Sequence, residues 1–109
     1  MEQQAQTAFT AIASADELEE GQVKGYSVGA TKIVICRRGG RYYAMYGICS
    51  HAGGPLCRGE LDGEVLVCPW HGWEFNLESG ICEIEPTLRQ QTYEVKVEDG
   101  QIWVAVYEA

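Results

Sequence analysis

Two short stretches of the chain each hold one cysteine and one histidine, and they constrain the fold more than any other feature. The first is residues 49–51 (Cys-Ser-His) and the second is residues 68–71 (Cys-Pro-Trp-His), with sixteen residues between His51 and Cys68. Together they use both histidines and two of the five cysteines of the chain. Sulfur and nitrogen ligands in two close pairs are the usual sequence form of a tetrahedral metal site. We therefore expect the fold to bring Cys49, His51, Cys68 and His71 to one point.

The order of the ligand types allows two kinds of metal centre. One is a structural zinc ion, and the other is a 2Fe–2S cluster whose two irons have different ligands. Zinc fingers usually pair cysteine with cysteine and histidine with histidine, whereas each stretch here supplies one of each. Glycines also surround the ligands, at positions 47, 53, 54 and 72. They permit the close backbone approach through which N–H groups reach cluster sulfides. The pattern favours the cluster, and a zinc-binding module is the alternative.

The remainder of the sequence predicts an all-β, antiparallel fold in a single domain of residues 1–109. The Gly-Gly pair at 39–40 and the Asp-Gly pair at 99–100 are hairpin signals. Ser14 followed by Glu17 has the form of a capping box, which predicts one or two helical turns over 14–20. Residues 47–86 are rich in glycine and form an insert between two β-rich flanks. We expect strands at 7–13, 24–29, 31–38, 41–48, 64–67, 73–76, 92–98 and 101–107.

Charge and hydropathy exclude several classes of partner. Sixteen acidic residues against eight basic ones give a formal net charge of −8, which argues against binding to nucleic acid or to anionic lipid. No window approaches the roughly 18 apolar residues of a membrane span. The first residues lack the features of a secretory signal. An odd number of cysteines, at least two of them suited to metal, is typical of a reducing cytoplasm.

The two stretches resemble the signature of the Rieske 2Fe–2S family, which is Cys-x-His and then Cys-Pro-x-His-Gly. The resemblance implies a Rieske-like antiparallel β sandwich whose inserted subdomain binds the cluster. It also implies that Cys49 and Cys68 ligate one iron, while His51 and His71 ligate the other near the protein surface. Electrons would then enter and leave at this histidine edge. Pro86 matches the proline of the family's cluster-covering loop.

Departures from one branch of the family indicate which branch the chain resembles. Rieske proteins of cytochrome complexes carry a disulfide between the two cluster loops, and the matching positions here are Gly54 and Trp70. In that branch a serine and a tyrosine also donate hydrogen bonds to the cluster sulfurs, where this chain has Trp73 and Phe75. Because such bonds stabilise the added electron, their loss predicts a low reduction potential. The chain is thus similar to the Rieske-type ferredoxins that serve aromatic-ring oxygenases.

These resemblances predict a cytoplasmic, monomeric electron carrier rather than an enzyme. It would take electrons from a flavin- or NAD(P)H-dependent reductase and pass them to a terminal oxygenase, docking transiently to each. A small subunit of a larger reductase, such as a nitrite reductase, is the alternative. The terminal oxygenase itself is a weaker alternative, because its mononuclear iron needs two further histidines.

Three cysteines remain outside the predicted ligand set. Cys36 falls in a strand and is expected in the core. A bridge between Cys57 and Cys82 is conceivable, since both lie in the insert. Two tryptophans, Trp70 and Trp73, flank His71 and are expected to shield the cluster from water. Acidic residues of the insert form a docking face or a solvated rim; they are Glu60, Asp62, Glu74, Glu78, Glu83 and Glu85.

Overall fold

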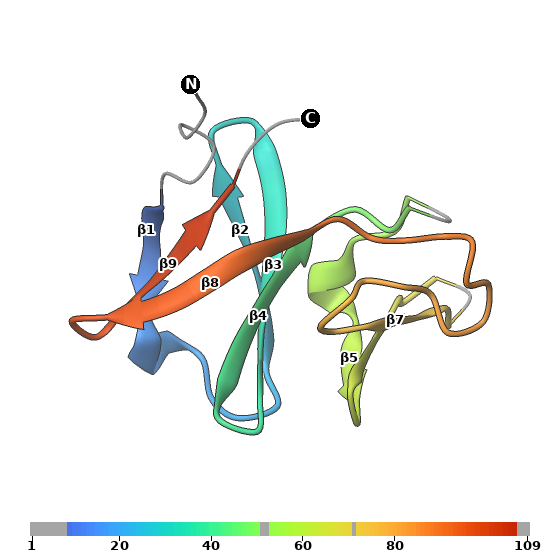
Figure 1. The fold of residues 1–109 in the computed structure, drawn as a ribbon, viewed down its shortest axis with the longest axis horizontal. Helices are drawn as coiled ribbons and strands as arrows, with labels where there is room; N and C mark the ends of the chain where they lie inside the picture. The colour runs from blue at the N-terminus through green and yellow to red at the C-terminus, as the bar shows by residue number, and fades with distance from the viewer. Residues whose placement is uncertain (1–8, 51–52, 71, 107–109) are drawn as a thin grey trace.

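The fold consists almost entirely of β-strands joined by short turns (Figure 1). The computed structural model describes residues 9–50, 53–70 and 72–106. Within these ranges there is no helix long and apolar enough to cross a membrane. The elements in chain order are β1 (Thr10–Ser14), the 3₁₀ turn η2 (Ala15–Glu17), β2 (Val23–Val28), β3 (Thr31–Arg38), β4 (Arg41–Tyr46), the 3₁₀ turn η3 (Leu56–Arg58), β5 (Glu60–Asp62), β6 (Val65–Val67), β7 (Glu74–Asn76), β8 (Thr92–Glu98) and β9 (Gln101–Ala105).

The strands form a large sheet of order β1-β9-β8-β4-β3-β2 and a small sheet of order β5-β6-β7. All pairings are antiparallel, which confirms the predicted fold class. The two halves of the large sheet are joined through two residue pairs of β4 and β8, Ala44 with Tyr93 and Met45 with Thr92. The small sheet lies beside the large one, and the chain returns from it into the large sheet as β8 (Figure 1). The small sheet lies within residues 47–86, where the sequence predicts the insert.

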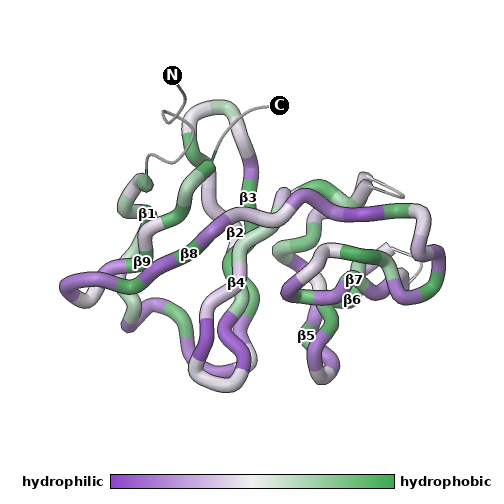
Figure 2. Tube along the Cα trace, viewed as in Figure 1, coloured by the Kyte–Doolittle hydropathy of each residue, from purple (hydrophilic) through white to green (hydrophobic). Residues whose placement is uncertain are grey.

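Two hydrophobic cores lie on opposite sides of β3. The first, called here the base core, contains Leu18, Ile33, Ile35, Ala44, Tyr93, Ile102 and Val104. The second, called here the insert core, contains Val34, Cys36, Met45, Cys49, Leu56, Leu66, Cys68, Phe75, Leu77 and Cys82. The base core takes residues from both halves of the large sheet. Hydrophilic residues gather near the tips of the β3–β4 and β8–β9 hairpins (Figure 2).

Strand β3 is buried on both faces, and this explains its unbroken apolar run. Successive side chains of a strand point to opposite faces. Ile33 and Ile35 therefore enter the base core, while Val34 and Cys36 enter the insert core. A strand covered on both sides reads as a continuous hydrophobic run rather than an alternating one. The expectation that Cys36 is a core residue is confirmed, and burial raises the pKa of its thiol to about 12.

Most predicted elements form, with differences at their ends. The capping box of Ser14 and Glu17 is present, but the turn it starts is the three-residue η2, because Leu18 is extended and enters the base core. Strand β4 ends at Tyr46, two residues before the predicted end, although the Gly47 N–H still donates to the carbonyl of Lys32 on β3. Strand β5 was not predicted, because its three residues, Glu-Leu-Asp, hold a single apolar side chain between two acids. Strand β9 ends at Ala105, and positions 7, 8 and 107 of the predicted terminal strands lie outside the described residues.

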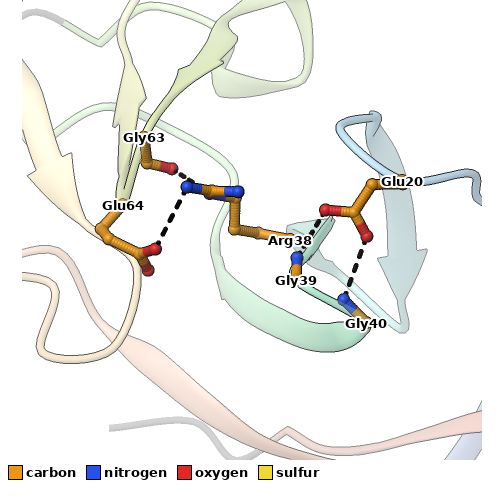
Figure 3. Close-up of polar contacts among 6 residues, drawn as sticks. All are labelled: Glu20, Arg38, Gly39, Gly40, Gly63 and Glu64. Atoms are coloured by element: carbon orange, nitrogen blue, oxygen red, sulfur yellow. Dashed lines mark hydrogen bonds and ion pairs between the residues drawn. The ribbon is translucent and has the colours of Figure 1, made fainter.

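A polar contact connects the turn after β3 to the tip of the small sheet (Figure 3). Arg38 Nε donates to the carbonyl of Gly63 at 2.7 Å, and its Nη2 lies 3.4 Å from the Glu64 carboxylate. On the other side of the turn, Glu20 accepts hydrogen bonds from the backbone N–H groups of residues 39 and 40. These two bonds hold the pKa of Glu20 below its usual value. Because the groups are exposed, the Arg38–Glu64 pair contributes about 1 kcal/mol or less.

The two-sided burial of β3 makes a prediction about stability. We expect Ile35→Ala to lower the free energy of unfolding by about 2–5 kcal/mol, because it removes a buried side chain from the base core. Lys32→Ala, at an exposed position of the same strand, should change it by about 0.5 kcal/mol or less. Urea unfolding followed by circular dichroism measures both. Equal losses in the two variants would contradict the burial of Ile35 in the base core.

Candidate metal centre

The two predicted ligand stretches form loops of the same size. The Cys49 N–H donates to the carbonyl of Gly54 at 2.9 Å, and the Cys68 N–H donates to the carbonyl of Trp73 at 2.8 Å. In each case a backbone hydrogen bond joins a cysteine to the fifth residue after it and closes the loop. The second loop is the tip of the hairpin formed by β6 and β7. The first is the tip of a shorter hairpin, closed by an isolated bridge between Ile48 and Pro55. Both cysteines thus occupy the same position at a hairpin tip.

The structure brings the two cysteines together in the insert core. Cys49 is 3% exposed and Cys68 is 1% exposed. Burial raises the pKa of the Cys68 thiol to about 11, opposed by a hydrogen bond from the Trp70 backbone N–H and reinforced by contact with the Cys49 side chain. Iron binds the thiolate form, so metal binding would release the proton that burial otherwise retains on Cys68. Two buried cysteine side chains that lie close together, each from a separate loop, match the donors expected for one iron of the cluster.

Because Gly54 has no side chain, the two loops can approach each other closely at this position. A Cβ atom at this position would lie 3.0 Å from the Cγ and Cδ2 atoms of Trp70 and 3.3 Å from the Cys68 sulfur. These distances are at the lower limit of real Cβ contacts, so a side chain here would press on both neighbours. The absence of a side chain therefore lets the first loop approach the sulfur of the second. Such a glycine fits a bulky group bound between the loops.

The other two predicted ligands, His51 and His71, lie outside the described residues. Their neighbours can be placed: Ser50, Gly53, Trp70 and Gly72 are exposed, in contrast to the two cysteines. Among the residues that the structure describes, no three His, Cys, Asp or Glu side chains are grouped so as to hold a metal ion. The assignment of all four ligands therefore stays a prediction, with its two cysteines placed together.

The remaining cysteines are free thiols with separate environments. Cys57 is exposed and packs against Gly25, where an added Cβ would lie 2.8 Å from the Cys57 Cβ. Cys82 is completely buried in the insert core, and its sulfur accepts a hydrogen bond from the Glu85 N–H at 3.4 Å. The conceivable bridge between Cys57 and Cys82 is absent.

The two tryptophans that were predicted to shield the cluster lie in different environments. Trp73 is half-buried and packs against the insert core, whereas Trp70 is 50% exposed and covers Gly54 with one side of its ring. Sequence reasoning missed one residue of this region, Gln90. Its side chain is completely buried and bonds to the backbone on both sides of Cys49. It lies in a polar run with no recognisable pattern, so the sequence gives no signal for it.

Comparisons with known proteins agree with this geometry. The family model of the Rieske [2Fe-2S] domain matches residues 8–107. The chain is 33% identical over 96 residues to ferredoxin CarAc of Metapseudomonas resinovorans, covering 86% of this chain and 90% of that protein. It is 31% identical over 98 residues to the ferredoxin component of biphenyl 2,3-dioxygenase of Rhodococcus jostii, and the match covers 89% of this chain and 92% of that protein. The fold is also similar to a chain in the solved complex of reduced oxygenase and oxidized ferredoxin in carbazole 1,9a-dioxygenase, with a TM-score of 0.82 and 31% identity. That superposition covers 91% of this chain and 94% of the other.

The ligand assignment predicts different outcomes for two cysteines of the insert. We expect Cys68→Ser to lose the bound iron and acid-labile sulfide, because a hydroxyl is a poor ligand for the iron of such clusters. Cys57→Ser should retain both, since Cys57 is an exposed residue of η3 that lies against Gly25 of β2. Iron and sulfide analysis of the purified variants, together with their visible spectra, tests this. A full cluster in Cys68→Ser would overturn the assignment.

Proposed function

Since the chain belongs to the Rieske [2Fe-2S] domain family, we propose that it is a Rieske-type ferredoxin that carries single electrons to a terminal oxygenase of the aromatic-ring-hydroxylating type. The observation that carries this proposal is the extent of the matches: ferredoxin components align over 86–89% of this chain and 90–92% of their own lengths. A structural relative was solved as a complex of ferredoxin and oxygenase. The resident cofactor is one 2Fe–2S cluster, and the family match removes the support for a zinc module.

We propose that Cys49 and Cys68 hold one iron of this cluster and that His51 and His71 hold the other. The burial of both cysteine side chains and their proximity in the insert core support the first half. The order of ligands in the family signature supports the second. When bound, the cluster supplies a one-electron redox couple. The chain contributes the rest: the two hairpin tips fix the sulfurs on the inner side, and the insert core keeps water from them.

The outer side of the two loops is the proposed docking surface for both partners. Ser50, Gly53 and Gly72 are exposed, and Trp70 is 50% exposed. On the following loop Ile84 is 56% exposed and is flanked by glutamates at 83 and 85. With a net charge of −8, the chain suits partners that present basic residues around an apolar centre.

One surface serving two partners implies that they bind in turn. The proposed cycle begins when a flavin- or NAD(P)H-dependent reductase docks and reduces the cluster. It then leaves, and the oxygenase takes its place and receives the electron. We propose that the protein acts in this way as a monomer in the cytoplasm, with no turnover of its own.

Reconstitution tests the carrier role. A flavin reductase and a ring-hydroxylating oxygenase, taken from the same genome, should form product from NAD(P)H only when the holoprotein is added. Cys68→Ser protein should not replace it, because the variant has no cluster to carry the electron. Product yield and NAD(P)H consumption are the measurements. Co-purification in a stable, stoichiometric complex with a reductase, without transfer to any oxygenase, would instead support the alternative of a reductase subunit.

The reduction potential is a separate prediction. We expect a value below zero, toward the low end of the range of about −150 to +300 mV for Rieske centres. The reason is that Trp73 and Phe75 occupy the positions where the high-potential branch has hydroxyl donors, and Phe75 is completely buried with no polar atom to offer. Redox titration followed by circular dichroism measures the potential. A value well above zero would contradict the assigned branch.

A further inference from the structure

Gln90 has an unusual environment for its residue type. Its side chain is completely buried, and among the described residues it is the only amide or charged side chain in that position. It lies just before β8, between the insert and the large sheet. A buried amide is costly unless its polar atoms find partners. The partners it finds are therefore informative about why a glutamine is present.

Among the described residues, the Gln90 side chain makes three hydrogen bonds, and each goes to the backbone around Cys49. Its Nε2 donates to the carbonyls of Tyr46 at 2.9 Å and of Ile48 at 2.5 Å. Its Oε1 accepts from the N–H of Ser50 at 2.9 Å. Both N–H groups of the amide are thus used, together with one acceptor site. The bonded residues include both immediate neighbours of Cys49.

The backbone of Gln90 is itself held in place. Its N–H donates to the carbonyl of Gly80 at 2.7 Å. A Cβ atom on Gly80 would lie 2.1 Å from the carbonyl oxygen of Gln90, so only glycine allows this approach. On the other side, the Tyr46 N–H donates to the carbonyl of Gln91 at 2.8 Å. The glutamine therefore extends from a fixed backbone to a loop that carries a predicted ligand.

We propose that Gln90 is a positioning residue for Cys49. By holding the backbone on both sides of this cysteine, it sets where the Cys49 sulfur lies relative to the Cys68 sulfur. It also engages the Ser50 N–H, which is then not available to donate to a cluster sulfide. Since hydrogen bonds to the sulfurs raise the potential, this second effect favours a low one. The proposal rests on the assignment of Cys49 as a ligand under the proposed function.

Gln90→Met tests the proposal, because methionine keeps a similar length but cannot make the three hydrogen bonds. We expect the variant holoprotein to lose its cluster to an iron chelator about tenfold faster or more, since several buried backbone groups lose their partners. We also expect a more positive reduction potential and altered g values in the EPR spectrum of the reduced protein. Visible absorbance, redox titration and EPR are the three measurements.

Gln91→Met is the matched control. It makes the same chemical change one residue away, at an exposed side chain whose amide donates to the carbonyl of Thr92. Its chelation rate, potential and EPR spectrum should equal those of the unmodified protein. Ile35→Ala is a second control, because it weakens the base core away from the loops. It should lower thermal stability without changing the potential or the g values.

The outcomes separate the inference from the function on which it rests. If Gln90→Met matches Gln91→Met in all three measurements, the positioning role is wrong and the ligand assignment is unaffected. If Cys68→Ser keeps its cluster, the ligand assignment itself fails. Should Gln90→Met give no folded protein, Gln90→Asn replaces it. This variant keeps the amide on a stem too short to reach all three groups, so we expect it also to lose the cluster faster than Gln91→Met; equal rates would overturn the proposal.

Discussion

The meeting of two equal hairpin tips is the constraint on which the rest of the structure depends. Each tip is closed by a hydrogen bond from a cysteine N–H to the carbonyl five residues later, and the two cysteine side chains meet in the insert core. Short loops of this kind have little stability of their own. The surrounding elements supply it: β6 and β7 support the second loop, while Gln90 and the bridge of Ile48 with Pro55 support the first.

The contact between Gly54 and Trp70 explains how the two loops are held without the disulfide that the sequence lacks at these positions. These are the positions at which the cytochrome-complex branch of the family joins its cluster loops by a disulfide. Here an added Cβ on Gly54 would lie 3.0 Å from the tryptophan ring, so the two positions are in contact across the loops. Packing thus replaces a covalent link. A ring that is half exposed can shift when a partner docks, whereas a disulfide holds both loops at a fixed separation.

The sequence predicted the β-rich architecture and the family because both depend on local patterns. Alternation in 92–98, the hairpin signal at 99–100 and the capping box at Ser14 act over a few residues. The two cluster motifs carry the chemistry in their spacing. Gln90 and the close approach of Gly80 to it could not be predicted, because they bring together residues about 40 positions apart or rely on a missing side chain. The faces of β3 were likewise hidden, since a run buried on both sides has no alternation.

The same arrangement suits the proposed function, in which two partners bind one surface in turn. The two cysteine side chains are buried in the insert core, and several of the described residues that follow them in the two loops are exposed, namely Ser50, Gly53, Pro69, Trp70 and Gly72. An electron carrier needs a centre that is held rigidly, since reorganisation slows transfer, and a surface that releases its partner quickly. The buried side answers the first need, with Gln90 and the hairpin bonds fixing the loops. For the proposed docking surface, the acidic net charge of the chain and the exposed apolar residues Trp70 and Ile84 meet the second need, because such a surface favours fast, salt-sensitive association with little buried area.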